Sequence, residues 1–251
     1  MDLKQRLKSK QVTIGSWLSI ANPAVAEIMA KSGVDWLGID MEHSALSVDQ
    51  CQELIRVIDL CEVVPLVRVG ANDPLLIKRA MDAGAYGVIV PMVNSAEDAV
   101  RAVKAVKYPP QGERGVGLAR AQGYGTKFEE YVGTINDKSI VIVQIEHKDA
   151  LSHLEEIFAV EGVDGFIVGP YDLSASFGVA GRFESGEMAQ ALAMIEQAAK
   201  KKNIPAGYHV VSPNPDMVHK KIEQGYTFIA YSVDFLLLGE SFRRDLLRIK
   251  E

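Results

Sequence analysis

The stretch IVIVQIEH at residues 140–147 decides the fold, because five apolar residues and one glutamine run without a break into a charged end. An uninterrupted apolar run of this length is typical of a parallel strand that is buried on both faces. The next such run, GFIVGPYD at residues 165–172, also turns polar after its last strand residue. A helical pattern over residues 151–160 lies between them, so the two runs predict one βαβ unit.

The same alternation of strand and helix patterns continues over the whole chain. The predicted strands cover residues 12–18, 35–40, 64–69, 87–91, 140–145, 165–168, 204–210 and 228–232. The predicted helices cover residues 24–31, 49–61, 74–82, 96–106, 151–160, 187–201, 215–223 and 235–249, and residues suited to helix caps stand at Ser47, Asp73, Ser95 and Asn214. Eight strands, each followed by a helix, predict an α/β fold: a single (β/α)8 TIM barrel that forms one domain over residues 1–251.

Two of the predicted connections bear on this interpretation. An open, doubly wound dinucleotide-binding sheet would need a glycine-rich turn after the first strand, whereas residues 19–23 read SIANP. The connection over residues 107–139 is unusually long and contains PPQGERGVG at residues 109–117. Long loops on a compact scaffold are commonly functional, so we expect this one to contribute to the activity.

The charge and cysteine content argue against several classes of protein. The chain has 27 Lys and Arg against 33 Asp and Glu, a net charge of −6, which favours neither nucleic acid nor an anionic membrane surface as a partner. Cys51 and Cys61 lie ten residues apart in one predicted helix, which does not suit a disulfide scaffold or a zinc site. The N-terminal segment is not apolar and no run reaches about 18 apolar residues, so we expect a cytoplasmic protein.

The carboxyl ends of barrel strands are where active sites are built, and polar or aromatic residues gather there in this sequence. They are Trp17, Asp40, Glu42, His43, Arg68, Gln144, Glu146, Asp172, His209 and Asp234. Exposure to solvent alone could account for a polar residue at any single strand end. The number and the chemical types of these residues together favour a site.

Two of these carboxylates are candidate metal ligands. Glu146 and Asp172 follow neighbouring strands, so they can converge on a hard divalent cation and leave its other positions to water and substrate oxygens. Paired carboxylates at strand ends can equally be structural, hydrogen-bonded groups, and the sequence leaves this open.

Arg68 and His43 are candidates for charge stabilisation and proton transfer. Arg68 is the cation at a central strand end, where it could hold a carboxylate or stabilise an enolate oxygen. A structural ion pair with Asp40 or Glu42 is the alternative. His43 lies three residues after Asp40, close enough for that carboxylate to orient its ring, and its place at a strand end favours a general acid or base.

A Schiff-base mechanism is disfavoured because none of the predicted strands contains a lysine. Lys148, the nearest, stands at the predicted start of a helix. The sequence also lacks a Gly-x-Ser-x-Gly elbow.

An ordered set of short motifs runs along the chain: GSWL at 15–18, DWLGIDMEH at 35–43, VRV at 67–69 with NDP at 72–74, VPMV at 90–93, RGVG at 114–117, VQIE at 143–146 and GPYDLS at 169–174. This set resembles the metal-dependent 2-keto acid aldolases of the HpcH/HpaI family. They cover nearly the whole chain. The resemblance implies a carbon–carbon lyase that reversibly cleaves a 4-hydroxy-2-keto acid into pyruvate and an aldehyde, through a metal-bound enolate and with Mg, Mn or Co.

The resemblance also implies roles for individual residues. Glu146 and Asp172 would bind the metal, and Trp17, Gln144, Gly169, Tyr171 and Asp172 would contact the substrate. His43 would be the acid–base residue, supported by Asp82, and Arg68 would stabilise the enolate. Asp82 falls near the end of a predicted helix, so we expect it to serve a neighbouring subunit of a homo-oligomer, a hexamer built as a trimer of dimers that exchange the C-terminal helix.

The sequence departs from the family pattern on the side of the pocket that would hold the aldehyde. Tyr171, the continuation of the Arg114 loop over residues 118–125, and YHV at residues 208–210 are the departures. The natural aldehyde is therefore not determined by the resemblance. Two alternatives remain at this point: a related lyase for a CoA thioester, for which we see no basic cluster, and oxaloacetate decarboxylation through the same enolate. A barrel that only binds a keto acid is disfavoured by the complete set of His43, Arg68, Glu146 and Asp172.

Overall fold

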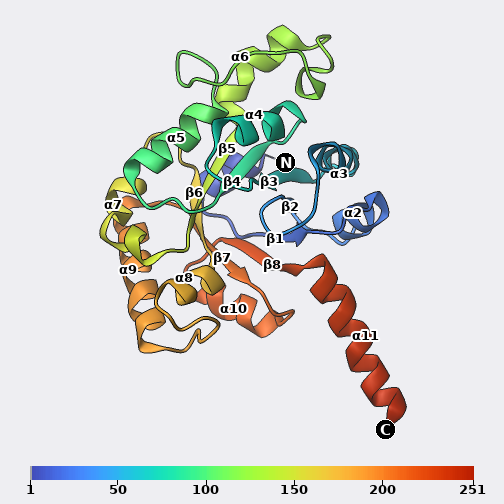
Figure 1. Cartoon of the computed structure of the whole chain (residues 1–251), viewed down its shortest axis with the longest axis vertical. Helices are drawn as coiled ribbons and strands as arrows, with labels where there is room; N and C mark the ends of the chain where they lie inside the picture. Colours follow the sequence, from blue (N-terminus) through green and yellow to red (C-terminus); the bar gives the residue numbers. More distant parts are fainter. Residues whose placement is uncertain (1) are drawn as a thin grey trace.

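A computed structural model describes residues 2–251, and its eight strands close into a parallel barrel in sequence order (Figure 1). The strands are β1 (Thr13–Leu18), β2 (Trp36–Asp40), β3 (Val64–Arg68), β4 (Gly87–Val90), β5 (Ile140–Ile145), β6 (Gly165–Val168), β7 (Ala206–Val210) and β8 (Phe228–Val233). The prediction of a (β/α)8 barrel is confirmed.

Most of the helices lie around the outer face of the barrel (Figure 1). The helices of the chain are α1 (Leu3–Lys8), α2 (Pro23–Ala30), α3 (Val48–Leu60), α4 (Pro74–Asp82), α5 (Ala96–Val106), α6 (Phe128–Lys138), α7 (Leu154–Ile157), α8 (Pro170–Ser176), α9 (Gly186–Lys202), α10 (Pro215–Glu223) and α11 (Asp234–Lys250), with 3-10 turns η1 (Arg120–Gln122) and η2 (Lys148–Ser152). Asp73, Ser95 and Asn214 cap α4, α5 and α10 through their side chains, as predicted. None of the helices in residues 2–251 combines the length and the apolar character that crossing a membrane requires.

Three helices were not predicted, and one predicted helix is interrupted. The long connection after α5 contains η1 and α6, and only Ile135 of α6 is buried, so its helical pattern in the sequence is weak. The short helices α1 and α8 also escaped prediction. The helix expected over residues 151–160 is instead η2 followed by α7, because His153 between them has a non-helical φ of −118°.

The barrel interior and the layer between barrel and helices form two separate apolar cores. Inside the barrel, Trp36 stacks on Phe228 with ring centroids 4.3 Å apart, and Trp17 meets Trp36 edge-on at 6.1 Å. Glycines make room for both indoles. A Cβ at Gly15 would lie 2.1 Å from the Trp36 ring, and one at Gly38 would lie 2.8 Å from the Trp17 ring. The two tryptophans therefore fill the space that glycines on the adjacent strand leave open.

The last helix, α11, behaves differently from the others. It points away from the barrel (Figure 1), and Asp234 is its only buried residue. The apolar side chains of Leu238, Phe242, Leu247 and Ile249 are all exposed. A contiguous set of exposed apolar side chains is typical of an interface with another chain.

Candidate active site

The carboxyl ends of the strands surround a pocket of about 340 Å³. The predicted site residues that line it are Trp17, Asp40, His43, Arg68, Gln144, Gly169, Tyr171, Asp172 and His209. They come from β1, β2, β3, β5 and β7, from the loop after β2 that holds His43, from Gly169 before α8, and from the first turn of α8, which holds Tyr171 and Asp172. The fold thus brings together residues that are far apart in the sequence.

Arg68 forms a buried, two-pronged ion pair with Asp40. The two residues are register partners at the ends of β2 and β3. Arg68 donates from Nε to Asp40 Oδ1 at 3.0 Å and from Nη2 to Oδ2 at 2.6 Å, while its Nε lies 3.4 Å from Glu42 Oε2. The guanidinium also sits over the Trp17 ring, 4.4 Å from its centroid. Burial acts to raise the pKa of Asp40, but the bonds from Arg68 outweigh it and hold this pKa below its ordinary value.

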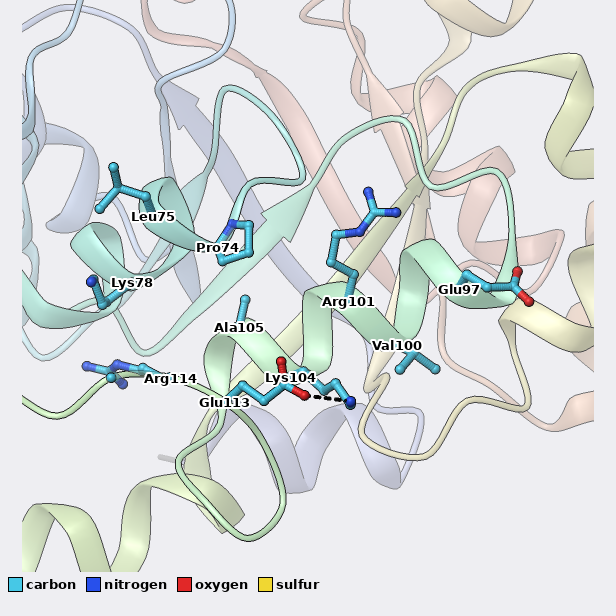
Figure 2. Close-up of a pocket in the computed structure, with 11 residues that line it drawn as sticks. Pro74, Leu75, Lys78, Glu97, Val100, Arg101, Lys104, Ala105, Glu113 and Arg114 are labelled. Atoms are coloured by element: carbon cyan, nitrogen blue, oxygen red, sulfur yellow. Dashed lines mark hydrogen bonds and ion pairs between the residues drawn. The ribbon is translucent and has the colours of Figure 1, made fainter.

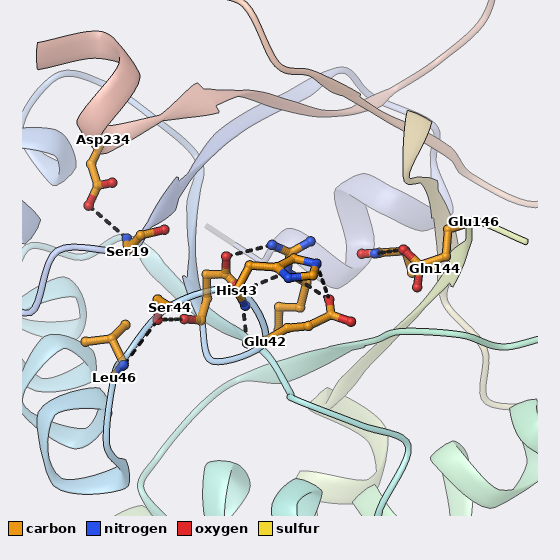
Figure 3. A network of polar contacts seen from close by, with 10 residues as sticks. Ser19, Glu42, His43, Ser44, Leu46, Gln144, Glu146 and Asp234 are labelled. Carbon is orange, nitrogen blue, oxygen red and sulfur yellow. Dashed lines mark hydrogen bonds and ion pairs between the residues drawn. The ribbon is translucent and has the colours of Figure 1, made fainter. Parts of the chain in front are cut away.

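The ring of His43 lies beside Glu42, and Asp40 contacts the backbone of His43. Asp40 Oδ1 accepts the backbone N–H groups of Glu42 and His43 at 3.0 and 3.1 Å, and both Asp40 oxygens accept hydrogen bonds from Arg68. His43 Nε2 is 3.7 Å from Glu42 Oε2 (Figure 3). The His43 side chain is 57% exposed, which leaves its ring accessible at the edge of the pocket.

Glu146 is buried at the end of β5 and is held by two donors. Its Oε1 accepts the backbone N–H of Met92 at 2.7 Å, and its Oε2 accepts the side-chain amide of Gln144 (Figure 3). Met92 has a positive φ of 53°, and its turn carries this N–H to the carboxylate. The VPMV motif contains Met92, but the contact of its backbone with Glu146 could not be read from the sequence.

The carboxylates of Glu42, Glu146 and Asp172 repel one another at this end of the barrel. Burial raises the pKa of Glu42 to about 7, and the nearby charges of Asp40 and Asp172 act in the same direction. Burial likewise raises the pKa of Glu146 to about 7, with added repulsion from Glu42 and Asp172. Glu42 Oε2 is buried without a hydrogen-bond partner in residues 2–251. Arg68 alone does not neutralise the carboxylates of Glu42, Glu146 and Asp172. The site therefore suits a further cation.

The oxygen donors fit a hard divalent ion held by few protein ligands. No group of three His, Cys, Asp or Glu side chains in residues 2–251 is arranged to hold a metal. Magnesium-like ions are commonly bound by one or two carboxylates, with water and substrate oxygens in the other positions. Asp172 lines the pocket, and Glu146 lies close enough to Asp172 for their charges to interact, so the two are the candidates for such a pair.

Two other predicted residues have different surroundings. Asp234 accepts the backbone N–H groups of Ser19 and Ile20, both at 2.8 Å, and thereby ties the start of α11 to the loop after β1. Asp82, at the end of α4, lies outside the pocket and accepts a 2.6 Å hydrogen bond from Arg114 Nη2.

The Arg114 side chain is fully enclosed and stacks over Tyr108, 4.6 Å from the ring centroid. It borders a second pocket of about 500 Å³ between α4 and α5, which Lys78 and Arg101 also line (Figure 2). That pocket holds none of the predicted substrate or metal residues.

Comparisons with known proteins agree with this geometry. A family model described as HpcH/HpaI aldolase/citrate lyase matches residues 13–240. The 2-dehydro-3,6-dideoxy-6-sulfogluconate aldolase of Pseudomonas putida is 40% identical over 97% of this chain and 95% of its own length. The 2-keto-3-deoxy-L-rhamnonate aldolase of Escherichia coli strain K12 is 37% identical over 98% and 92%.

A solved structure extends the similarity to three dimensions. An HpcH/HpaI aldolase/citrate lyase family protein from Burkholderia cenocepacia J2315 superposes with a TM-score of 0.94 at 34% identity, over 99% of each chain. The strand-end carboxylates and the paired Arg68 agree with the family model and with these relatives. The chain therefore belongs to the HpcH/HpaI aldolase/citrate lyase family and is a carbon–carbon lyase.

Proposed function

We propose that this enzyme reversibly cleaves a 4-hydroxy-2-keto acid derived from a sugar acid into pyruvate and an aldehyde, with the help of a divalent metal. The observation that carries the proposal is that Asp172 and the fixed cation Arg68 line one pocket, with the buried carboxylate of Glu146 bonded to Gln144 in the same lining. The names of the two aldolases described above support the substrate class.

Glu146 and Asp172 would hold Mg, Mn or Co. When bound, the metal would act as a Lewis acid that polarises the keto group of the substrate. Gln144 and Met92 fix the orientation of Glu146, so the ligand is positioned before any metal arrives.

Arg68 is the residue that stabilises the enolate. Its pair with Asp40 uses Nε and Nη2, which fixes the guanidinium plane and leaves Nη1 for a substrate oxygen. Trp17 packs under the same guanidinium and keeps it from rotating.

His43 transfers the proton of the 4-hydroxyl. Its exposed ring at the edge of the pocket can take that proton directly or through a water, and can return it in the reverse reaction. Glu42 lies beside this ring, with its Oε2 3.7 Å from Nε2.

The function is tested by following the exchange of pyruvate methyl protons with deuterium, which reports enolate formation without any aldehyde. We expect exchange with Mg, Mn or Co, none in EDTA, and recovery when metal is restored. Full exchange in EDTA, or inactivation by borohydride in the presence of pyruvate, would show a Schiff base instead and overturn the proposal.

We further propose that the enzyme works as a homo-oligomer in which α11 is exchanged between subunits and Asp82 supports the His43 of a neighbour. The exposed apolar residues of α11 and the position of Asp82 outside its own pocket motivate this. Mixing inactive Asp82→Ala subunits with inactive His43→Ala subunits should restore part of the activity, because some mixed sites combine both native residues. An active wild-type monomer at assay concentration would contradict it.

A further inference from the structure

Arg114 is a buried cation that lies outside the strand-end pocket and is bonded to Asp82. It stands on the loop that follows α5 (Figure 2), and its side chain has no exposed surface. Its guanidinium donates from Nη2 to Asp82 Oδ1 at 2.6 Å and from Nη1 to the hydroxyl of Tyr131 at 3.2 Å. The rings of Tyr108 and Tyr131 lie against it, with centroids 4.6 and 5.7 Å from Cζ. These contacts hold the Arg114 guanidinium in one orientation.

Asp82 depends on Arg114 for its own orientation. It is the last residue of α4, and no other group in residues 2–251 forms a hydrogen bond or ion pair with its carboxylate. Its side chain is 24% exposed, so part of the carboxylate faces away from the protein. Without its partner, such a side chain would be free to take several rotamers. Arg114 therefore selects the orientation in which Oδ1 points inward and Oδ2 can accept a further hydrogen bond.

The loop that carries Arg114 lies across the same end of α4. Arg120 Nη1 donates to the carbonyl oxygen of Ala83 at 3.3 Å, one residue beyond Asp82. Residues 115–119 are thus tied at both ends to the end of α4. Within this segment Val116 and Leu118 are 56% and 70% exposed. Exposed apolar side chains gathered in one place are typical of a surface that another chain covers, which supports a subunit contact beside Asp82.

The hold on Asp82 matters because a carboxylate that supports a histidine must be accurately placed. If Asp82 supports the His43 of a neighbouring subunit, the position of the carboxylate decides how well that ring is oriented to accept a proton. A displacement of about 1 Å can cost on the order of 100-fold in rate. The bond from Arg114 is the contact of this chain that prevents such a displacement.

We propose that Arg114 is a positioning residue, which fixes the Asp82 carboxylate so that its free oxygen reaches the His43 of the neighbouring subunit. Arg114 then acts on the neighbour's site and not on the pocket of its own subunit, from which it is absent. The inference rests on the proposed function and adds a third residue to its subunit contact. It also gives a role to the first residue of the RGVG motif at residues 114–117.

The first test is the variant Arg114→Met, which keeps an unbranched side chain of similar length against Tyr108 and removes every donor. We expect it to lower the kcat for cleavage by on the order of 100-fold, because Asp82 loses its fixed position. Arg101→Ala is the matched control. Arg101 lines the same second pocket as Arg114, and its ion pair, at 3.5 Å, is with Asp98 of its own helix. This control should keep the wild-type activity.

The second test co-expresses two inactive variants and measures cleavage by the mixed assemblies. Arg114→Met with His43→Ala should recover part of the activity, because some sites combine a native His43 with a neighbour that keeps both Arg114 and Asp82. Arg114→Met with Asp82→Ala should recover none, because no subunit then carries an intact pair. A residue that supported only the pocket of its own subunit would give the opposite result in both mixtures.

Arg114→Lys keeps the test decisive if Arg114→Met does not fold. Lysine leaves a positive charge beside Asp82 but lacks the fork that joins Asp82 to Tyr131. It should lower kcat less than Arg114→Met does, and it should give the same two results in the mixtures.

The outcomes separate this inference from the proposed function. Failure of Asp82→Ala and His43→Ala subunits to restore activity together would defeat the proposed subunit contact itself. If that pair restores activity, the role of Arg114 alone is overturned by wild-type activity in Arg114→Met, or by a mixture of Arg114→Met with His43→Ala that stays inactive.

Discussion

The two ends of the barrel interior bury very different side chains. At the amino ends of the strands, the interior is filled by apolar residues such as Trp36, Ile140 and Phe228, and Leu3 and Leu7 of α1 pack against them. At the carboxyl ends it buries Asp40, Arg68, Gln144 and Glu146. The same closed sheet thus has an apolar base and a charged mouth.

This difference indicates that the apolar end of the barrel stabilises the fold and that the charged end is the one suited to chemistry. Burying apolar surface contributes roughly 25 cal/mol per Å² to folding. Burying carboxylates opposes folding, and the raised pKa values of Glu42 and Glu146 are the signature of that cost. The charged mouth is retained for function, so substitutions at the two ends should have opposite consequences.

The largest expected effect is at the mouth. Glu146→Gln should lower metal-dependent cleavage by on the order of 1000-fold or more, because the charge stabilisation supplied by a metal amounts to several kcal/mol. The metal-free variant should be at least as stable as the wild type, since it no longer buries a carboxylate whose charged form is disfavoured by desolvation. Thermal unfolding in EDTA and steady-state kinetics measure both. A variant that unfolds early would show that the carboxylate is structural.

The converse substitution is at the base. Phe228→Ala removes the ring that stacks on Trp36 and should destabilise the protein by about 3–5 kcal/mol. The protein that remains folded should still exchange pyruvate protons in a metal-dependent way. Chemical denaturation gives the stability, with Phe228→Leu as the milder control. Loss of exchange without loss of stability would break the distinction between the two ends.

Arg68 belongs to both sides of this comparison, because it is buried and is the residue proposed to stabilise the enolate. Arg68→Ala should lower both cleavage and pyruvate exchange by roughly 100-fold to 1000-fold, the usual effect of losing one oxyanion donor. Both reactions pass through the enolate. If exchange stays normal while cleavage falls, Arg68 binds the aldehyde half instead.

The smallest expected effect is the pH dependence of stability. The pKa of Glu42 is raised in the folded state, so its protonation stabilises the metal-free protein fully below its ordinary pKa of 4.5. That contribution is lost as the pH rises through about 7. Between about pH 5 and 8 in EDTA, the Tm of the wild type should therefore fall more than that of Glu42→Gln. Equal slopes for the two proteins would refute the role given to Glu42.

Much of the fold was predictable, since buried parallel strands leave continuous apolar runs and helices leave an amphipathic period. The helices that were missed are short, like α1 and α8, or barely buried, like α6, and their patterns are correspondingly faint. The pocket residues were predictable in the same way, because strand ends in a barrel must converge on one face. His153 separates η2 from α7, although the sequence pattern predicted one continuous helix here. The neighbouring residues gave no sign of this interruption.

The sequence by itself determined the eight strands, the polar residues at their ends and the family to which their order belongs. Only the tertiary structure decided how those residues meet. It pairs Arg68 with Asp40 in two bonds, moves the His43 ring to Glu42, and sets a neutral His209 against Trp17. The physical reason is that periodicity reports which side of an element is buried, whereas charge, protonation and hydrogen bonding depend on neighbours brought from distant parts of the chain when the barrel closes.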